Sequence, residues 1–219
     1  MTDQLVLNFS LDGHAHLRDY IGEARFKLVQ LTGFIYLHGL KGSGKSHLLQ
    51  GMCHRAIEEG RSALYFRDLS MLEPAVLEGL DHIDLICLDD LDSVIESYDW
   101  QLALFHLVNV VKDAGKTLII SSAIPVSGLN VGLSDLDSRI KGAYRLATDY
   151  LDDEKKLEVI GSKARHRGFY MSEEVCRFIL SRAHRDMHYL ARLVDQLDQE
   201  TLRRQKKVTI PLVKVALGL

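Results

Sequence analysis

A glycine-rich loop that ends in a lysine and a serine carries the strongest chemical signal in this sequence. Residues 39–46 read Gly-Leu-Lys-Gly-Ser-Gly-Lys-Ser and match the phosphate-binding pattern G-x-x-x-x-G-K-[ST] in full. The glycines allow a tight turn that aims backbone N–H groups at phosphate oxygens, while Lys45 supplies a positive charge and Ser46 a hydroxyl ligand for Mg²⁺. The residues expected to bind nucleotide here are Gly39, Lys41, Gly42, Ser43, Gly44, Lys45, Ser46 and His47.

The surroundings of this loop favour a nucleotide site over a chance glycine turn. An apolar run over residues 34–37 precedes the loop, and residues 47–57 place apolar side chains at helical spacing after it. The motif requires a strand before it and a helix after it, because the helix N-terminus adds its positive dipole end to the site. We therefore expect ADP or ATP, with Mg²⁺, as the ligands.

Two carboxylates follow a second apolar run. Residues 85–88 are apolar, and Asp89 and Asp90 come directly after them. Parallel strands bind ligands at their carboxyl ends, so Asp89 is expected to hold Mg²⁺ opposite Ser46, and Asp90 to orient or deprotonate the attacking water. The alternative is a strand that leaves the core into a charged loop.

Short apolar or β-branched runs alternate with helical stretches up to about residue 149. Strands are expected at residues 34–38, 62–66, 84–89, 116–122 and 144–148. This alternation predicts an α/β fold, with a five-stranded parallel sheet flanked by helices on both faces.

The pattern changes after Asp149, where no further strand is indicated. Helices are expected at residues 152–166, 172–183, 186–204 and 209–217. Ser172 is suited to cap one of them, and Pro211 fits the first turn of another. The expected organisation is a peptide over residues 1–10, a core over 11–149 and a small all-helical lid over 150–219.

Composition excludes several classes of protein. The chain has 219 residues, 47% of them hydrophobic, and a formal net charge of −3. It contains no apolar stretch near the roughly 20 residues of a membrane span and no export signal, so we expect a cytoplasmic protein without a membrane partner. Cys53, Cys87 and Cys176 are odd in number and scattered, which argues against a disulfide framework or a zinc site and favours core positions.

Taken together, these motifs resemble the AAA+ ATPase domain of the replication initiator DnaA. The likeness rests on the phosphate loop, the Asp-Asp strand end, residues 133–139 (Leu-Ser-Asp-Leu-Asp-Ser-Arg) and the four-helix tail. It covers nearly the whole chain from about residue 9. The sequence ends at Leu219, after the lid, so the initiator's DNA-binding helix-turn-helix domain is expected to be absent. The Hda family of DnaA-homologous regulatory inactivators is the closer resemblance, also in residues 195–198 and 209–211.

This resemblance implies a catalytic role for Arg139. In such assemblies nucleotide lies between subunits, and Arg139 matches the arginine finger that one subunit inserts into its neighbour's site, where the guanidinium neutralises charge that develops on the γ-phosphate. The neighbour implied here is DnaA. The alternative is an arginine that pairs with Asp135 or Asp137 on its own helix.

The start of the chain is similar to the peptide by which bacterial proteins bind the DNA polymerase III sliding clamp (beta subunit), Q-L-x-L-x-[FL]. Leu5, Leu7 and Phe9 would enter surface pockets, and Gln4 would form a hydrogen bond at the pocket mouth. DNA would then be reached indirectly, through the clamp. The same alternation is typical of an ordinary first strand.

Two departures from the family pattern indicate weak hydrolysis by this chain itself. The polar sensor position after the strand at 116–122 reads Ser121-Ser122-Ala123, where either serine could reach the γ-phosphate. In the lid, His188 stands where the family has a sensor arginine, with Arg185 nearby as a substitute phosphate ligand. Both changes fit a protein that holds ADP as a structural switch.

The function expected from the sequence is negative regulation of replication initiation. The protein would dock on the DNA-loaded sliding clamp and promote hydrolysis of ATP bound to DnaA. One alternative is an autonomous DNA-dependent ATPase resembling helicase loaders, and another is a clamp-binding adaptor whose phosphate loop is only a folding element. The sequence leaves open whether the chain forms a homodimer or a larger oligomer.

Overall fold

The computed structural model of the chain describes residues 11–13, 15–184, 186–204 and 208–218. These residues form two compact units. The first contains Gly22–Asp149 and the described residues up to Leu17, and the second contains the chain from Tyr150 onwards together with Arg18–Ile21. Arg18–Ile21 therefore group with the second unit, although they lie inside the core that the sequence predicts over residues 11–149.

A five-stranded, fully parallel sheet forms the centre of the first unit, in the order β2-β3-β4-β1-β5. The strands are β1 (Phe34–His38), β2 (Ala63–Phe66), β3 (Leu85–Leu88), β4 (Thr117–Ser122) and β5 (Tyr144–Ala147). The expected strands and the expected sheet are confirmed. Because β1 pairs with both β4 and β5, the end of β1 lies between the ends of two other strands.

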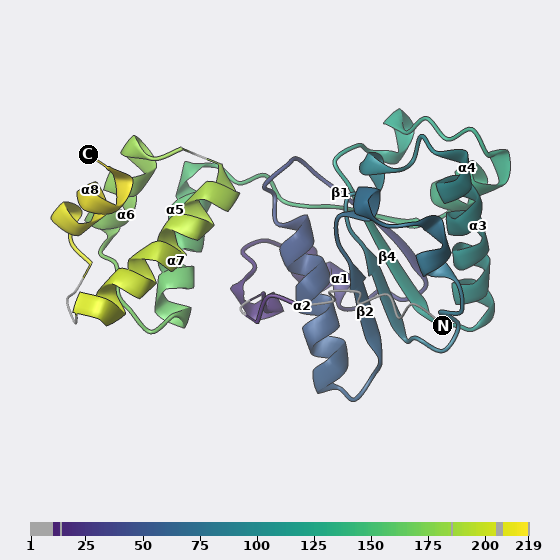
Figure 1. Cartoon of the computed structure of the whole chain (residues 1–219), viewed down its shortest axis with the longest axis horizontal. Helices are drawn as coiled ribbons and strands as arrows, with labels where there is room; N and C mark the ends of the chain where they lie inside the picture. Colours follow the sequence, from purple (N-terminus) through teal and green to yellow (C-terminus); the bar gives the residue numbers. More distant parts are fainter. Residues whose placement is uncertain (1–10, 14, 185, 205–207, 219) are drawn as a thin grey trace, which may run out of the picture. The chain divides into compact units, whose positions relative to one another are not determined.

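Helices cover the two faces of this sheet (Figure 1). The helices of the first unit are α1 (Ala24–Leu28), α2 (Lys45–Glu58), α3 (Tyr98–Asp113) and α4 (Ser134–Lys141). The long helix α2 packs on one face, where it contacts β2, β3 and β4, and α3 and α4 pack together on the other face. Single 3-10 turns occur at Leu17–Asp19, Leu69–Met71, Pro74–Leu77, Leu91–Ser93 and Val126–Gly128.

Strand alternation decides which side chains point towards each layer of helices. The core on the α3 and α4 side contains Tyr36, Phe66, Ile86, Leu88, Leu118, Ile120, Trp100, Leu104, Leu136 and Ile140. Successive residues of a strand point to opposite faces, so the buried residues at the intervening positions, such as Tyr65 and Cys87, point towards α2.

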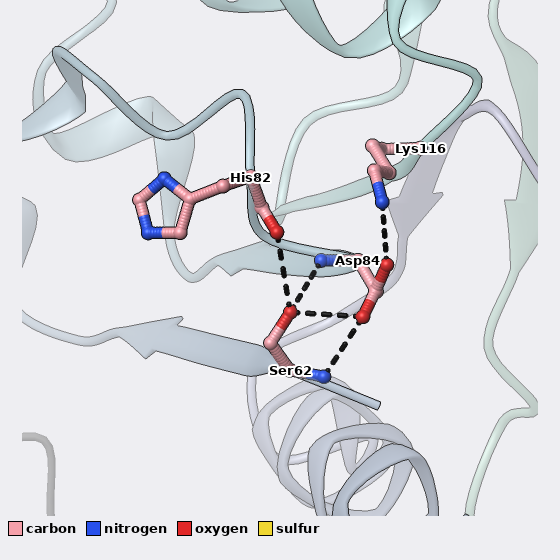
Figure 2. A network of polar contacts seen from close by, with 4 residues as sticks. All are labelled: Ser62, His82, Asp84 and Lys116. Atoms are coloured by element: carbon pink, nitrogen blue, oxygen red, sulfur yellow. Dashed lines mark hydrogen bonds and ion pairs between the residues drawn. The ribbon is translucent and has the colours of Figure 1, made fainter. Parts of the chain in front are cut away.

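A polar network ties together the amino ends of β2, β3 and β4 (Figure 2). The backbone N–H and the hydroxyl of Ser62 both donate to Oδ2 of Asp84 at 2.9 Å, and Nζ of Lys116 lies 2.6 Å from Oδ1. The Lys116 ammonium and the two Ser62 donors hold the pKa of Asp84 well below its usual range. This network fixes the edge of the sheet opposite the phosphate loop.

The second unit contains the four expected helices of the lid. They are α5 (Asp153–His166), α6 (Glu173–Arg182), α7 (Met187–Arg204) and α8 (Ile210–Leu217). Ser172 caps α6 as expected, because its hydroxyl accepts from the N–H of Val175 at 3.3 Å. Arg167, at the end of α5, lies 2.8 Å from Asp195 and 3.6 Å from Asp198 on α7.

The described residues test the expectations for the cysteines and for membrane-spanning helices. Cys53, Cys87 and Cys176 are all buried and unpaired, as expected of core residues. None of the described helices is long and apolar enough to cross a membrane.

Candidate functional site

The phosphate loop connects the end of β1 to the start of α2 and depends on backbone conformations that favour glycine. Gly42 has a φ of 78° and Gly44 a φ of 88°, both in the left-handed region. Gly44 directly precedes α2, so the first N–H groups of that helix have no intrahelical partner. These N–H groups, together with the helix dipole, make the loop a suitable anion site.

Lys45 has its ammonium inside the loop. Its side chain is 6% exposed, and Nζ donates to the carbonyl oxygens of Gly39 at 2.9 Å and Leu40 at 3.3 Å. A buried ammonium needs such acceptors, because burying one unpaired ion costs roughly several kcal/mol of stability. Phosphate oxygens of a bound nucleotide would provide stronger acceptors at the same place.

The segment after β5 closes over the loop at Gly39. Oγ1 of Thr148 donates to Oγ of Ser43 at 2.6 Å, and the Thr148 N–H donates to the carbonyl of His38 at 2.8 Å. A Cβ at position 39 would lie 1.8 Å from Oγ1 of Thr148. Glycine is therefore needed at 39 for space, whereas at 42 and 44 it is needed for φ.

Three further loop residues from the sequence prediction have different surroundings. Lys41 is exposed. Ser46 is half-buried, and within the described residues its hydroxyl has no hydrogen-bond partner, so it remains available for a ligand. The ring of His47 bonds the carbonyl oxygen of His16 through Nε2 at 2.8 Å, and its backbone N–H lies in the first turn of α2, where such groups have no intrahelical partner.

Asp89 is a buried carboxylate held from both sides. It is 3% exposed; Oδ2 accepts from the hydroxyl of Tyr65 on β2 at 2.7 Å, and Oδ1 accepts from the hydroxyl of Ser121 on β4. The hydroxyl of Ser46 and this carboxylate are hard oxygen donors, the type that Mg²⁺ prefers. The residues present therefore suit a magnesium ion.

Asp90 differs from Asp89 in both conformation and exposure. It has a φ of 54°, its side chain is exposed, and its N–H donates to Oγ of Ser121 at 3.0 Å. Partial desolvation and the negative charge of Asp89 raise the pKa of Asp90, while Lys45 acts in the opposite direction. A raised pKa makes a carboxylate a better proton acceptor, which suits a group that activates water.

The structure distinguishes the two serines of the sensor position. Ser121 points to the α2 side of the sheet and contacts Asp89 and Asp90. Ser122 points to the other side, where its Oγ accepts from the N–H of Ile124 at 3.0 Å. Ser121 is therefore the serine that belongs to the site.

Asp12 and Leu17 lie along α2, a contact that the sequence did not predict. Oε1 of Gln50 accepts from the N–H of Asp12 at 2.8 Å, and Nε2 of His54 lies 2.9 Å from the Asp12 carbonyl oxygen. A Cβ on Gly51 would lie 2.9 Å from the backbone nitrogen of Leu17. Periodicity describes only one element at a time, so it could not show that Asp12 and Leu17 pack against this helix.

Arg139 lies on α4, on the sheet face opposite α2. Leu136 and Ile140 of α4 are buried in the core shared with α3, while Arg139 is half-buried. In the part of the chain that the structure describes, Arg139 makes no hydrogen bond or ion pair. Asp137, one of the partners considered from the sequence, instead lies 2.5 Å from Nζ of Lys141.

A buried glutamine fixes the start of the helix that carries Arg139. Gln101 of α3 is 4% exposed; its Oε1 accepts from the N–H of Leu133, and its Nε2 donates to the carbonyl of Ile95, both at 2.7 Å. No motif in the sequence indicated this role.

The remaining predicted site residues fall outside the described structure. Gln4, Leu5, Leu7 and Phe9, and likewise Arg185, are not among the described residues. His188 lies in the first turn of α7, but its side chain is outside the description.

The chain is similar to one protein family over its lid and to a bacterial protein over nearly its whole length. The family model "Hda, lid domain" matches residues 153–217, which include all four lid helices. An uncharacterized protein of Haemophilus influenzae is 40% identical over 220 residues, a match that covers 99% of this chain and 94% of the relative.

Solved structures share the fold at lower identity. Domain III of the Thermotoga maritima initiator DnaA superposes with a TM-score of 0.77 at 19% identity, covering 95% of this chain and 98% of that one. AMPPCP-bound DnaA from Aquifex aeolicus gives 0.72 at 19% identity, covering 90% and 69%. The Thermotoga maritima RuvB branch-migration motor gives 0.67 at 14% identity, covering 93% and 71%. The AAA+ fold predicted from the sequence is confirmed.

Proposed function

The chain belongs to one family with its Haemophilus influenzae relative, a family of DnaA-like AAA+ proteins of the Hda type, and we propose that it restrains replication initiation by promoting hydrolysis of ATP on DnaA. The lid family and the DnaA-type fold indicate a DnaA-related regulator. Its action would require a bound nucleotide, a docking partner and a catalytic residue.

The nucleotide is proposed from the loop geometry. Gly42 and Gly44 have the required φ values, the Lys45 ammonium lies within the loop, and the Ser46 hydroxyl is available for a ligand. The DnaA of Aquifex aeolicus, which shares this fold, is bound to AMPPCP. We infer that this chain binds ADP or ATP with Mg²⁺, and that ADP is the form it holds at rest.

Mg²⁺, when bound, would neutralise charge on the phosphates. Ser46 and Asp89 would hold it, and Tyr65 and Ser121 keep Asp89 in one orientation. Asp90, with its raised pKa, would accept a proton from water in whatever hydrolysis this chain performs itself.

The action on DnaA is proposed from the surroundings and the position of Arg139. Arg139 has a guanidinium without a described polar partner, and α4 lies across the sheet from the helix that begins with Lys45. This position supports a role for Arg139 at the γ-phosphate of a neighbouring molecule rather than at its own phosphate loop. The charge that it would neutralise in the transition state makes it the catalytic contribution of this chain.

The docking partner is proposed from the N-terminal sequence. Gln4, Leu5, Leu7 and Phe9 form a sliding-clamp peptide, so the protein would act at clamps already loaded on DNA and contact DNA only through them. Tethering by the clamp would raise the local concentration of the regulator around DnaA near newly replicated DNA. The site of action would be the cytoplasm.

A reconstituted assay tests this function. ATP bound to DnaA is followed over time with the purified chain, in the presence and absence of clamp loaded on DNA. We expect hydrolysis to accelerate only when both are present. Hydrolysis by the chain alone, stimulated by DNA, would instead favour the autonomous ATPase. Stimulation that survives loss of nucleotide binding would favour the adaptor.

A further inference from the structure

The hydroxyl of Tyr65 makes a hydrogen bond to Asp89 that the packing of its ring does not require. Tyr65 lies on the outer strand β2 and is 5% exposed, and its hydroxyl reaches past the end of β3 to Oδ2 of Asp89 at 2.7 Å. A phenylalanine would fill the same apolar space. The hydroxyl adds one interaction, with the carboxylate that the proposed function assigns to Mg²⁺.

In this bond the Tyr65 hydroxyl donates and the Asp89 carboxylate accepts. Ser121 donates to the other oxygen, so donors on two different strands fix the carboxylate from both sides.

A carboxylate fixed in this way retains lone pairs that can point in only a limited set of directions. Metal ligands are commonly oriented by hydrogen bonds of this type, and loss of such a partner weakens metal affinity. We propose that Tyr65 is a positioning residue for magnesium, which orients Asp89 for the Mg²⁺ that Ser46 and Asp89 would hold. This inference rests on the proposed nucleotide site and assigns a further residue to it.

Tyr65→Phe removes only the hydroxyl, and Tyr36→Phe is its matched control. Tyr36 is also fully buried, and its hydroxyl donates to the carbonyl of Ile124 at 2.7 Å, on the sheet face opposite Asp89. The affinity of each variant for AMPPCP is measured in EDTA and across a Mg²⁺ titration. We expect affinity in EDTA to stay within about twofold of the parent for both variants, since neither hydroxyl contacts the phosphate loop. The Mg²⁺ concentration for half-maximal effect should rise about tenfold in Tyr65→Phe and remain unchanged in Tyr36→Phe.

The outcomes separate this inference from the function on which it rests. An unchanged Mg²⁺ titration in Tyr65→Phe would mean that the hydroxyl only offsets the burial of Asp89, and an equal shift in Tyr36→Phe would mean a general loss of rigidity; either result overturns the proposal. If Mg²⁺ has no effect on AMPPCP binding by the parent, only the role of Tyr65 is overturned. If the parent does not bind AMPPCP, the proposed function is overturned. If Tyr65→Phe does not fold, Ser121→Ala releases the other oxygen of Asp89 and must shift the Mg²⁺ titration in the same direction for the proposal to stand.

Discussion

Thr148 and Ser43 are joined by a hydrogen bond of 2.6 Å between their hydroxyls, which ties the segment after β5 to the middle of the phosphate loop. A Cβ at Gly39 would lie 1.8 Å from Oγ1 of Thr148 and 3.0 Å from Oγ of Ser43, so both hydroxyls occupy the space beside this glycine. The shape of the loop thus depends on a residue more than one hundred positions further along the chain.

Gly39→Ala tests this dependence. The added Cβ would lie 1.8 Å from Oγ1 of Thr148, so the loop or the threonine must move. Overpacking of this kind costs about 1–3 kcal/mol, and we expect nucleotide affinity to fall by about tenfold or more. Adding Thr148→Ala should restore part of the nucleotide affinity, because the atom nearest to the new Cβ would then be Oγ of Ser43 at 3.0 Å. The double variant is compared with Thr148→Ala alone. Equally weak binding in the double variant would mean that the contact at Gly39 is not the cause.

Lys45→Ala should abolish the stabilising effect of ADP. A ligand that binds only the folded state raises the melting temperature, by about 5–10 °C for a chain of this size at a hundredfold excess over Kd. We expect this shift in the parent and in Lys112→Ala, whose exposed lysine lies at the far end of α3, but not in Lys45→Ala. Calorimetry with and without ADP measures it. A parent whose melting does not respond to ADP has no working nucleotide site.

Asp84→Asn should destabilise the protein in a pH-dependent way. The pKa of Asp84 is lowered in the folded state, chiefly by Lys116, so its stabilising effect is present above the unfolded carboxyl pKa of about 3.9 and is lost as pH falls towards the lower folded pKa. Urea unfolding at several pH values should show a gap between parent and variant at pH 7 that narrows below about pH 4. Asp81→Asn, at an exposed aspartate nearby, is the control and should show no such gap. A gap independent of pH would assign the effect to the shape of the asparagine.

Leu5→Ala with Leu7→Ala should weaken binding to the sliding clamp. Each leucine is expected to contribute about 1.5–3 kcal/mol of burial in the complex, so clamp affinity should fall by more than tenfold while nucleotide affinity is unchanged. Val6→Ala with Asn8→Ala changes the alternate positions of the same peptide and should have a small effect. If the Leu5 and Leu7 variant binds the clamp like the parent, residues 4–9 have another role.

Much of this fold could be predicted because its signals are local. Apolar runs and helical spacing gave the five strands and the four lid helices, and the phosphate loop lies between a strand and a helix as its motif requires. Ser172 was identified as a cap because capping involves residues only three positions apart.

The contacts that arrange the site could not be predicted because they join distant parts of the chain. Tyr65 lies within the strand predicted at residues 62–66, yet it contacts Asp89 only because β2 and β3 are neighbours in the sheet. The choice between Ser121 and Ser122 depended on which face of β4 meets α2, and a run of six buried residues gives no alternation from which to infer it. Periodicity predicts where the helices and strands lie along the chain. Which side chains are in contact depends on the order of the strands and on the face of the sheet to which each side chain points.

Arg139 is proposed to act on nucleotide held by another molecule. The rate at which ATP bound to DnaA is hydrolysed with DNA-loaded clamp tests this, measured for the parent, Arg139→Ala, Arg139→Lys and the control Lys141→Ala. Lys141 lies on the same helix and pairs with Asp137. We expect Arg139→Ala to reduce stimulation by roughly 10³- to 10⁵-fold, the range for arginine fingers, and Arg139→Lys to restore little, since a point charge does not replace a planar fork. The nucleotide affinity and clamp affinity of these variants, and the stimulation by Lys141→Ala, should match the parent. Normal stimulation of DnaA by Arg139→Ala, or loss of its own nucleotide, would show that Arg139 does not act on nucleotide held by another molecule.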